Sequence, residues 1–367
     1  MNVSSLCATV TVFVAHFALE QSTRAAPPVY PDKSNLMVFR DAHGVEHPVL
    51  RAEDWQRRRA DILENMQLVM GPLPDQGKRV ALAVETTEEV RAEKHTRRTI
   101  SFATEPGDRL PGCLLVPHEH RERLPAVLCL HQTTKVGKDE PAGLAGSPNL
   151  HYAAELAERG YVTLAVDYPN FGTYQFDPYA NGYSSATMKG IWNHMRAVDL
   201  LQSLAEVDPE RIGVIGHSLG GHNSLFVAAF DPRIKCVVTN CGFCSFARYY
   251  DGNLAGWSHK GYMPRIGEVY ALDPRTMPFD FTEVVAAIAP RAVLAIAPKR
   301  DGNFAVAGVE ECITAARPVF HLLGADEKLA AHYPDCEHDF PPECREIAYR
   351  WFDRWLIKAS RPEGLSH

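Results

Sequence analysis

The chain has 367 residues, of which 46% are hydrophobic and 23% are charged, and its formal net charge is −7. These proportions are typical of a globular protein that can bury a sizeable core. The acidic balance and the lack of a lysine- or arginine-rich run argue against binding to nucleic acid. No apolar stretch reaches 18 residues, so the sequence predicts no transmembrane helix and no stable membrane insertion.

The N-terminus carries an apolar run from Leu6 to Leu19, followed by "STRAAPP" with small residues around Ala25. An apolar segment of this length before small residues is typical of a secretory signal peptide. We expect residues 1–25 to be removed, so that Ala26 starts a secreted or periplasmic protein. Because the terminal amine is the only positive charge before the run, a mobile or membrane-peripheral tail is the alternative.

From Pro27 to about Gly112 the pattern is mixed. The stretch "AEDWQRRRADILENMQLVMG" has apolar residues at helical spacing and stops at Gly71 and Pro72. The segments that follow, "KRVALAVETTEEVRAEKHTRRTISFAT" and "LPGCLLVP", alternate like antiparallel strands joined by a turn at "PGD". This part of the chain therefore predicts one helix followed by antiparallel strands.

After this point, continuous apolar strands alternate with helical stretches. The strands are expected at "AVLCLH", "VTLAVD", "RIGVIGHS", "CVVTNCG", "AVLAIAP" and "LAAHYPD". Strands without polar alternation are typical of a parallel sheet covered by helices on both faces. The sequence predicts an α/β fold with a mostly parallel central sheet, helices on both faces and antiparallel N-terminal strands. We expect one domain over residues 26–367, with residues 243–281 as a cap-like insertion.

The stretch "RIGVIGHSLGGHNSLF" places Ser218 between Gly216 and Gly220, at the end of a strand and the start of a helix. A Gly-x-Ser-x-Gly match alone is weak, and a tight turn with a capping serine is the alternative. The strand-turn-helix context favours an exposed nucleophile held on a strained turn. The helix N-terminus there would direct N–H groups toward a developing oxyanion.

A serine nucleophile needs a base and an acid, and both occur later in the chain. Asp301 follows the strand "AVLAIAP", and His338 follows the strand "LAAHYP". The order serine, aspartate, histidine is the one that this type of sheet requires, with all three at the carboxyl edge. We therefore expect Ser218 as nucleophile, His338 as general base and Asp301 as the acid that orients it.

Each partner has rivals. His321 and His332 lie nearer the apolar pattern and are expected to pack or to face solvent. Asp326 precedes a strand and so falls at the opposite edge of the sheet from Asp301. His217, beside the nucleophile, is expected to shape the turn rather than to act as the base. The carboxylates that flank His338 (Asp335, Glu337 and Asp339) are not expected to aim inward with it.

These residues give the chain a resemblance to the α/β-hydrolase superfamily, and within it to dienelactone hydrolase-like and acetyl xylan esterase-like members. The resemblance covers about residues 80–360 and rests on "GHSLGG", "MPFDFTEVVAAIAPRAVLAIAP", Asp301 and "CEHDFPPE". The stretch "PFDFTEVVAAIAPR" also resembles glucuronoyl esterases. Those enzymes carry an arginine directly after the nucleophile, where this chain has Leu219, and this departure argues against a uronate ester.

Two further groups complete the predicted site. The oxyanion needs two donors, which we expect to be the backbone N–H of Leu219 and a donor from Gln132 or Thr133 in the loop "HQTT". Specificity is expected from the insertion between Phe243 and Phe281. An aromatic, polar cover suits sugar rings or aryl esters, although its aromatic residues could instead be core. The candidate substrate-binding residues there are Tyr250, Trp257, His259 and Arg265.

The sequence thus predicts a serine hydrolase that cleaves carboxylic esters, with acetylated carbohydrate as a candidate substrate. A dienelactone-type or other small-ester hydrolase is the alternative, followed by an exopeptidase and a catalytically inactive binding protein. No cofactor is expected, and no metal: Cys241 and Cys244 have suitable spacing, but no second pair follows. Eight cysteines remain after the signal peptide, an even number that permits disulfides without defining their pairing.

Overall fold

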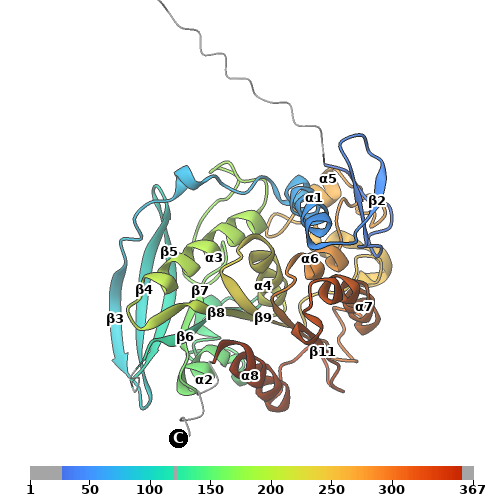
Figure 1. Ribbon diagram of the computed structural model, residues 1–367. Coiled ribbons are helices and arrows are strands. Elements are labelled where there is room, and N and C mark those ends of the chain that lie inside the picture. The colour runs from blue at the N-terminus through green and yellow to red at the C-terminus, as the bar shows by residue number, and fades with distance from the viewer. Residues whose placement is uncertain (1–26, 119–121, 358–367) are drawn as a thin grey trace, which may run out of the picture.

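The computed structural model describes residues 27–118 and 122–357. The predicted signal peptide and the expected start at Ala26 lie outside these residues and stay predictions. Nine strands form one sheet, and Figure 1 shows how they lie side by side. In chain order they are β3 (Glu85–Arg91), β4 (His95–Glu105), β5 (Asp108–Pro117), β6 (Leu124–Leu130), β7 (Val162–Val166), β8 (Val207–His217), β9 (Ile234–Asn240), β10 (Ala292–Ile296) and β11 (Leu329–His332).

The spatial order of the strands is β11-β10-β9-β8-β6-β7-β5-β4-β3. The six strands from β11 to β7 are paired in parallel, and β5, β4 and β3 are added antiparallel. Every residue of β7 and β10 is buried, which explains why these strands show no polar alternation in the sequence. Both the predicted parallel sheet and the predicted antiparallel N-terminal strands are confirmed.

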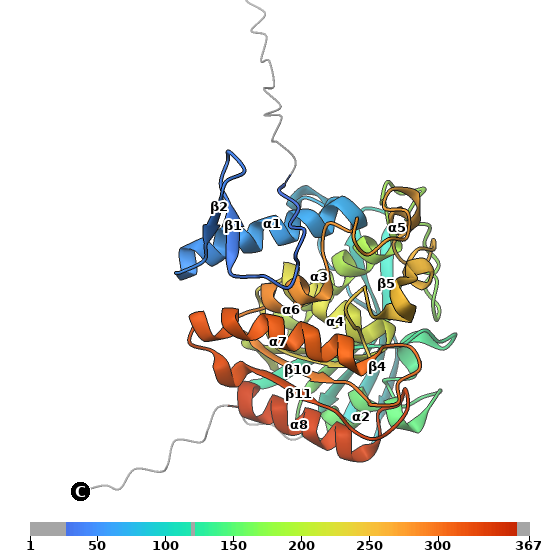
Figure 2. The same ribbon diagram turned by 90° about the vertical axis from the view of Figure 1, so that its right-hand side faces the viewer.

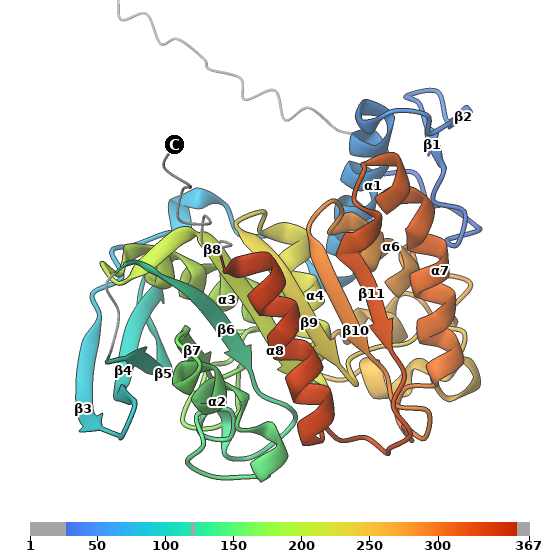
Figure 3. The ribbon, with the colours of Figure 1, turned by 60° about the horizontal axis from the view of Figure 1, so that its bottom comes forward.

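Helices cover both faces of the sheet. Figure 3 shows α2 and α8 on the near face, with α3 and α4 behind the strands. The predicted layering is therefore confirmed. The helices are α1 (Ala52–Met70), α2 (Tyr152–Glu158), α3 (Ala186–Ser203), α4 (Leu219–Phe230), α5 (Arg265–Glu268), α6 (Phe281–Ala287), α7 (Val306–Leu322) and α8 (Pro342–Leu356).

The N-terminal region packs beside α6 through α1 (Figure 2). The apolar residues at helical spacing in α1 are fully buried, and the helix ends just before Gly71, whose φ of 92° suits a residue without a side chain. A buried ion pair, with 2.6 Å between Arg58 Nη2 and Glu283 Oε1, joins α1 to α6. The small sheet of β1 (Val38–Arg40) and β2 (Glu46–Pro48) beside this helix was not predicted from the sequence.

The segment from residue 243 to residue 281 contains α5 and two 3₁₀ turns, η4 (Tyr249–Gly252) and η5 (Leu254–Trp257). Phe243, Phe246 and Phe279 are buried in the main core, so part of this segment is ordinary core, as the alternative expectation held. Its role as a cap-like insertion stays a prediction.

Within residues 27–118 and 122–357, no helix is both long and apolar enough to cross a membrane.

Candidate active site

Ser218 lies on a strained turn between the end of β8 and the start of α4. Its φ of 54° and ψ of −116° are unusual for a residue with a side chain. The flanking glycines permit this geometry: a Cβ on Gly216 would overlap the backbone of Gly220, and a Cβ on Gly220 would overlap the carbonyl of Leu130. The turn therefore sets the serine at the carboxyl edge of the sheet, directly before the first turn of a helix.

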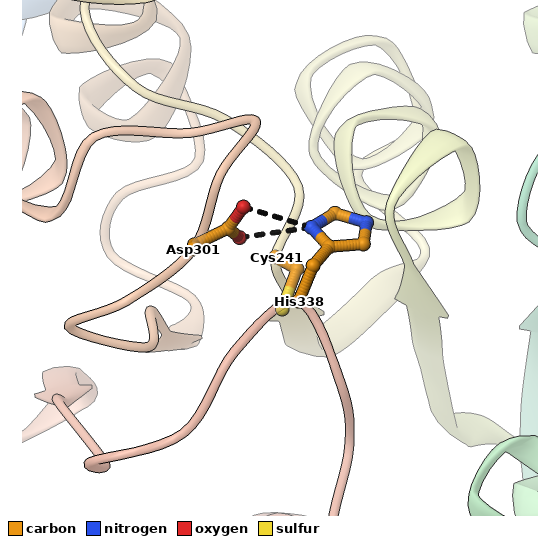
Figure 4. Close-up of side chains that lie close together, drawn as sticks. All are labelled: Cys241, Asp301 and His338. Atoms are coloured by element: carbon orange, nitrogen blue, oxygen red, sulfur yellow. Dashed lines mark hydrogen bonds and ion pairs between the residues drawn. The ribbon is translucent and has the colours of Figure 1, made fainter.

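Asp301 and His338 form a hydrogen-bonded pair at the same edge. His338 Nδ1 lies 2.9 Å from Asp301 Oδ1 and 3.0 Å from Oδ2 (Figure 4). The two residues follow β10 and β11, which are neighbouring parallel strands. The Asp301 side chain is only 1% exposed, and its Oδ1 also accepts hydrogen bonds from the backbone N–H groups of Asn303 and Phe304. The second ring nitrogen of His338 points away from Asp301 and stays available for a proton.

The surroundings of Asp301 favour its ionised form. Burial by itself would raise the pKa of this carboxyl, but the hydrogen bond from His338 and the two backbone N–H groups outweigh it. The pKa of Asp301 therefore lies below its ordinary value. An ionised carboxylate at this position accepts the Nδ1 proton of His338 and leaves Nε2 free to act as a base.

This shift predicts a pH dependence of stability. Because the pKa of Asp301 is lower in the folded state than in the unfolded chain, its carboxylate stabilises the fold above about pH 4, and this contribution is lost as the pH falls through the folded-state pKa. We expect Asp301→Asn to lower the melting temperature near neutral pH, and the gap from wild type to narrow at about pH 3. Thermal unfolding followed by circular dichroism measures both. A gap that widens on acidification would contradict the assignment.

His217 packs against the Asp301–His338 pair without joining it. Its ring centroid lies 4.7 Å from that of His338, and its Nδ1 lies 2.6 Å from Asn240 Nδ2. Burial, reinforced by the neighbouring His338, lowers the pKa of His217 to about 3. The ring is thus neutral near pH 7 and places no positive charge beside the imidazolium that would form on His338. This geometry favours the expected role in shaping the turn.

A cavity of about 390 Å³ opens over Ser218. Ser218, Leu219 and His338 lie in its wall, together with Gln132 and Thr133 from the loop after β6. The structure therefore brings both candidate donors of the second oxyanion hydrogen bond to the predicted nucleophile. The side chain of Gln132 is anchored to a neighbouring part of the protein, because its Nε2 donates a hydrogen bond to Glu140 Oε1 at 3.1 Å. Asp301 lies behind His338 and does not line the cavity.

The four residues predicted to contact substrate divide into two pairs. Trp257 and His259 line the cavity, as expected. Tyr250 and Arg265 do not: Tyr250 is 54% exposed, and Arg265 donates from Nε to the backbone oxygen of Leu68. Arg265, a candidate substrate-binding residue, is thus directed from α5 toward α1 and away from the cavity.

Six residues of the cavity wall were not among the predicted site residues: His222, Tyr249, Gly256, Tyr262, Asn303 and Phe304. His222 is four residues after Ser218 on α4, which places it one helical turn further on the same face. Asn303 and Phe304 follow Asp301 directly, in the loop that binds its carboxylate. The short sequence distance of His222, Asn303 and Phe304 from the predicted catalytic residues could therefore have indicated that they lie at the site.

The rival carboxylates have partners elsewhere. Asp326 Oδ1 lies 3.0 Å from His321 Nδ1, with both side chains exposed at the start of β11. Asp339, next to the predicted base, accepts a hydrogen bond from Asn149 Nδ2 at 2.6 Å. Within the described residues, neither side chain forms a hydrogen bond or ion pair with His338.

One further residue lies beside the pair. The possible ligand atoms of Cys241, Asp301 and His338 lie within 4.8 Å of one another, a spacing that could accommodate a metal ion. The donor set fits poorly, because burial raises the pKa of the Cys241 thiol well above its usual value and opposes the thiolate that a metal binds. All eight cysteines of the described residues carry free thiols.

These features define the class of protein. A mainly parallel sheet, a serine on a strained strand-to-helix turn, and an acid and a histidine after later strands together make an α/β-hydrolase. Residues 148–361 match the model of the prolyl oligopeptidase family, and the chain belongs to this family. The matched region contains Ser218, Asp301 and His338.

Comparison with individual proteins gives the same fold class. The chain is 26% identical over 311 residues to YtaP of Bacillus subtilis (strain 168), whose name assigns it only provisionally to the hydrolases; the match covers 81% of this chain and all of YtaP. It is 36% identical over 101 residues to the acetyl esterase Axe7A of Xylanibacter ruminicola, covering 27% of this chain and 22% of Axe7A. A glucuronoyl esterase from Solibacter usitatus aligns with a TM-score of 0.69 at 19% identity, covering 90% of this chain and 99% of that one.

Proposed function

We propose that the chain is a serine hydrolase of carboxylic esters, with Ser218 as nucleophile, His338 as general base and Asp301 as the orienting acid. The observation that carries the proposal is the hydrogen-bonded Asp301–His338 pair, whose histidine shares one cavity wall with a serine on a strained turn. A serine hydroxyl is a weak nucleophile until a base takes its proton, and a fixed imidazole supplies that base.

The residues suggest the following sequence of steps. Ser218 Oγ attacks the ester carbonyl while His338 Nε2 takes the hydroxyl proton, and the ionised Asp301 stabilises the imidazolium. The negative charge that forms on the carbonyl oxygen is met by the backbone N–H of Leu219, at the start of α4. His338 then gives its proton to the leaving alcohol. Water then enters and attacks the acyl carbonyl while His338 takes one of its protons. The bond between the acyl carbon and Ser218 Oγ breaks, His338 returns the proton to Ser218 Oγ, and the carboxylic acid leaves.

The size and lining of the cavity favour a small, uncharged ester as the substrate. Its volume of about 390 Å³ is at the lower end for ligand pockets. Trp257 and Tyr262 supply flat apolar faces, and His259 and Gln132 supply polar groups, a combination that suits a sugar ring. The similarity to the acetyl esterase Axe7A agrees with an acetylated carbohydrate as substrate.

The same wall argues against two other substrates. Among the described residues, the side chains that line the cavity include no lysine, arginine, aspartate or glutamate. Leu219 stands where glucuronoyl esterases carry arginine, and this departure argues against a uronate ester. An exopeptidase must bind a charged peptide terminus, and neither an N-terminal ammonium nor a C-terminal carboxylate would find a partner of opposite charge among these four residue types.

The remaining alternatives are a dienelactone-type or other small-ester hydrolase and an inactive binding protein. A fluorophosphonate probe separates the last of these, because it labels only an activated serine. Release of acetate from acetylated xylan, compared with hydrolysis of a dienelactone, separates the two esterase candidates. An unlabelled Ser218 in a folded protein without esterase activity would contradict the whole proposal.

We expect activity to fall steeply as the acyl chain of a p-nitrophenyl ester lengthens from acetyl to octanoyl. The cavity is small and its wall is aromatic and polar, so a long chain would find little aliphatic surface to lie on. The measurement is kcat/KM across the series of esters. Faster turnover of the octanoate than of the acetate would point to a lipase-like pocket and contradict the substrate class.

A further inference from the structure

A hydrogen bond joins two parts of the cavity wall that come from distant parts of the chain. Thr133 Oγ1 and Tyr262 OH lie 2.7 Å apart, although 129 residues separate them in the chain. Thr133 belongs to the loop after β6, which carries both candidates for the second oxyanion donor, and Tyr262 belongs to the segment of residues 243–281. Both side chains line the cavity over Ser218.

The loop after β6 is held differently at its two candidate donors. Gln132 is anchored by contacts outside the cavity: its side-chain amide donates to Glu140, and its backbone oxygen lies 2.5 Å from Nδ1 of the buried His131. The other ring nitrogen of His131 accepts from the backbone N–H of Tyr168 at 2.9 Å. Within the described residues, the side chain of Thr133 makes one hydrogen bond, the one to Tyr262. The outer part of the loop therefore depends on the opposite side of the cavity.

Tyr262 is itself well anchored. Its backbone N–H donates to His259 O at 2.8 Å, and its backbone oxygen accepts from Thr187 N, on α3, at 3.3 Å. Its ring packs against the ring of His259 at a centroid distance of 4.2 Å, and against that of His222 at 5.8 Å. Burial raises the pKa of the phenol, so the hydroxyl keeps its proton near pH 7.

We propose that Tyr262 is a positioning residue. Through the hydrogen bond between its hydroxyl and that of Thr133, it holds Thr133 and the loop after β6 over Ser218. The inference rests on the proposed esterase mechanism. An oxyanion donor stabilises the transition state only when it lies about 2.7–3.1 Å from the charged oxygen. A misplacement of about 1 Å can reduce the rate about 100-fold, so a loop that loses its outer anchor should lose transition-state binding.

The primary test is Tyr262→Phe, which removes the hydroxyl and keeps the ring. We expect kcat for p-nitrophenyl acetate to fall about tenfold to 100-fold, with a much smaller change in KM. Tyr179→Phe is the matched control. The Tyr179 hydroxyl also donates a hydrogen bond to the segment of residues 243–281, to Lys260 O at 2.7 Å, but it does not reach the loop after β6. The control should keep the kcat of wild type.

A double-mutant cycle with Thr133 separates positioning from a general loss of packing. Thr133→Val should lower kcat like Tyr262→Phe, the double variant should be no slower than either single variant, and Thr133→Ser should keep activity. Thr133→Val also serves if Tyr262→Phe does not fold, as judged by circular dichroism. Wild-type kcat in either single variant, or additive losses in the cycle, would overturn the proposal.

Fluorophosphonate labelling of Ser218 distinguishes this outcome from failure of the esterase mechanism. If Ser218 is labelled and the Tyr262 and Thr133 variants keep the kcat of wild type, only the positioning role is refuted.

Discussion

Ser218→Ala is expected to lower kcat for p-nitrophenyl acetate by about 10⁵-fold to 10⁶-fold, since the proposed mechanism has no other nucleophile. The substitution removes only a hydroxyl from a partly exposed position, so the fold should be unchanged. The strained backbone at Ser218 is retained, because alanine keeps the same Cβ. Initial rates give the loss of activity, and thermal unfolding confirms the intact fold.

The matched control for this substitution is Ser203→Ala. Ser203 ends α3, and its hydroxyl donates to the backbone oxygen of Leu200, away from the cavity. This variant should keep its activity and its fluorophosphonate labelling, whereas Ser218→Ala should lose both. If Ser218→Ala retained activity within about tenfold of wild type, the hydrolysis would have to use another nucleophile, and the assignment would be wrong.

Asp301→Asn is expected to lower kcat by about 10⁴-fold with little change in KM. An asparagine can turn its NH₂ group toward His338 Nδ1 and select the tautomer with its proton on Nε2, which cannot accept the serine proton. The contacts that place the side chain, from the N–H groups of Asn303 and Phe304, go to an oxygen that asparagine retains. The loss should therefore fall on catalysis, and steady-state kinetics with p-nitrophenyl acetate separates kcat from KM.

Asp326→Asn supplies the matched comparison, because it makes the same chemical change at the other edge of the sheet. Asp326 contacts the exposed His321, and a surface pair of this kind contributes little to stability. Its kinetic constants should match those of wild type. Near-wild-type activity in Asp301→Asn would mean that another group orients His338, and a large loss in Asp326→Asn would contradict the position assigned to the catalytic acid.

Much of this architecture could be predicted because its signals are local. The helix at residues 52–70 repeats its apolar residues every three or four positions, and the buried strands β7 and β10 are short runs without polar residues. The catalytic candidates could be predicted in the same way, since each lies in the loop or turn that follows a strand. In a parallel sheet all such positions meet at one edge, so Ser218, Asp301 and His338 could be grouped without knowing the order of the strands.

The composition of the cavity wall could not be predicted in this way. Trp257 and Arg265 looked equivalent in the sequence, eight residues apart in one polar, aromatic segment, yet one lines the cavity and the other donates to Leu68. The contact between Thr133 and Tyr262 has no local signal either.

The sequence by itself therefore determined the class of sheet, the turn at Ser218 and the edge on which the candidate catalytic residues lie. Only the tertiary structure decided which side chains surround that edge. The physical reason is that periodicity and turn geometry depend on interactions within about ten residues, whereas the path of an irregular segment depends on what it packs against. Here that path runs from β9 to α6 through buried Phe246 and Phe279, and this packing turns Tyr262 toward the cavity.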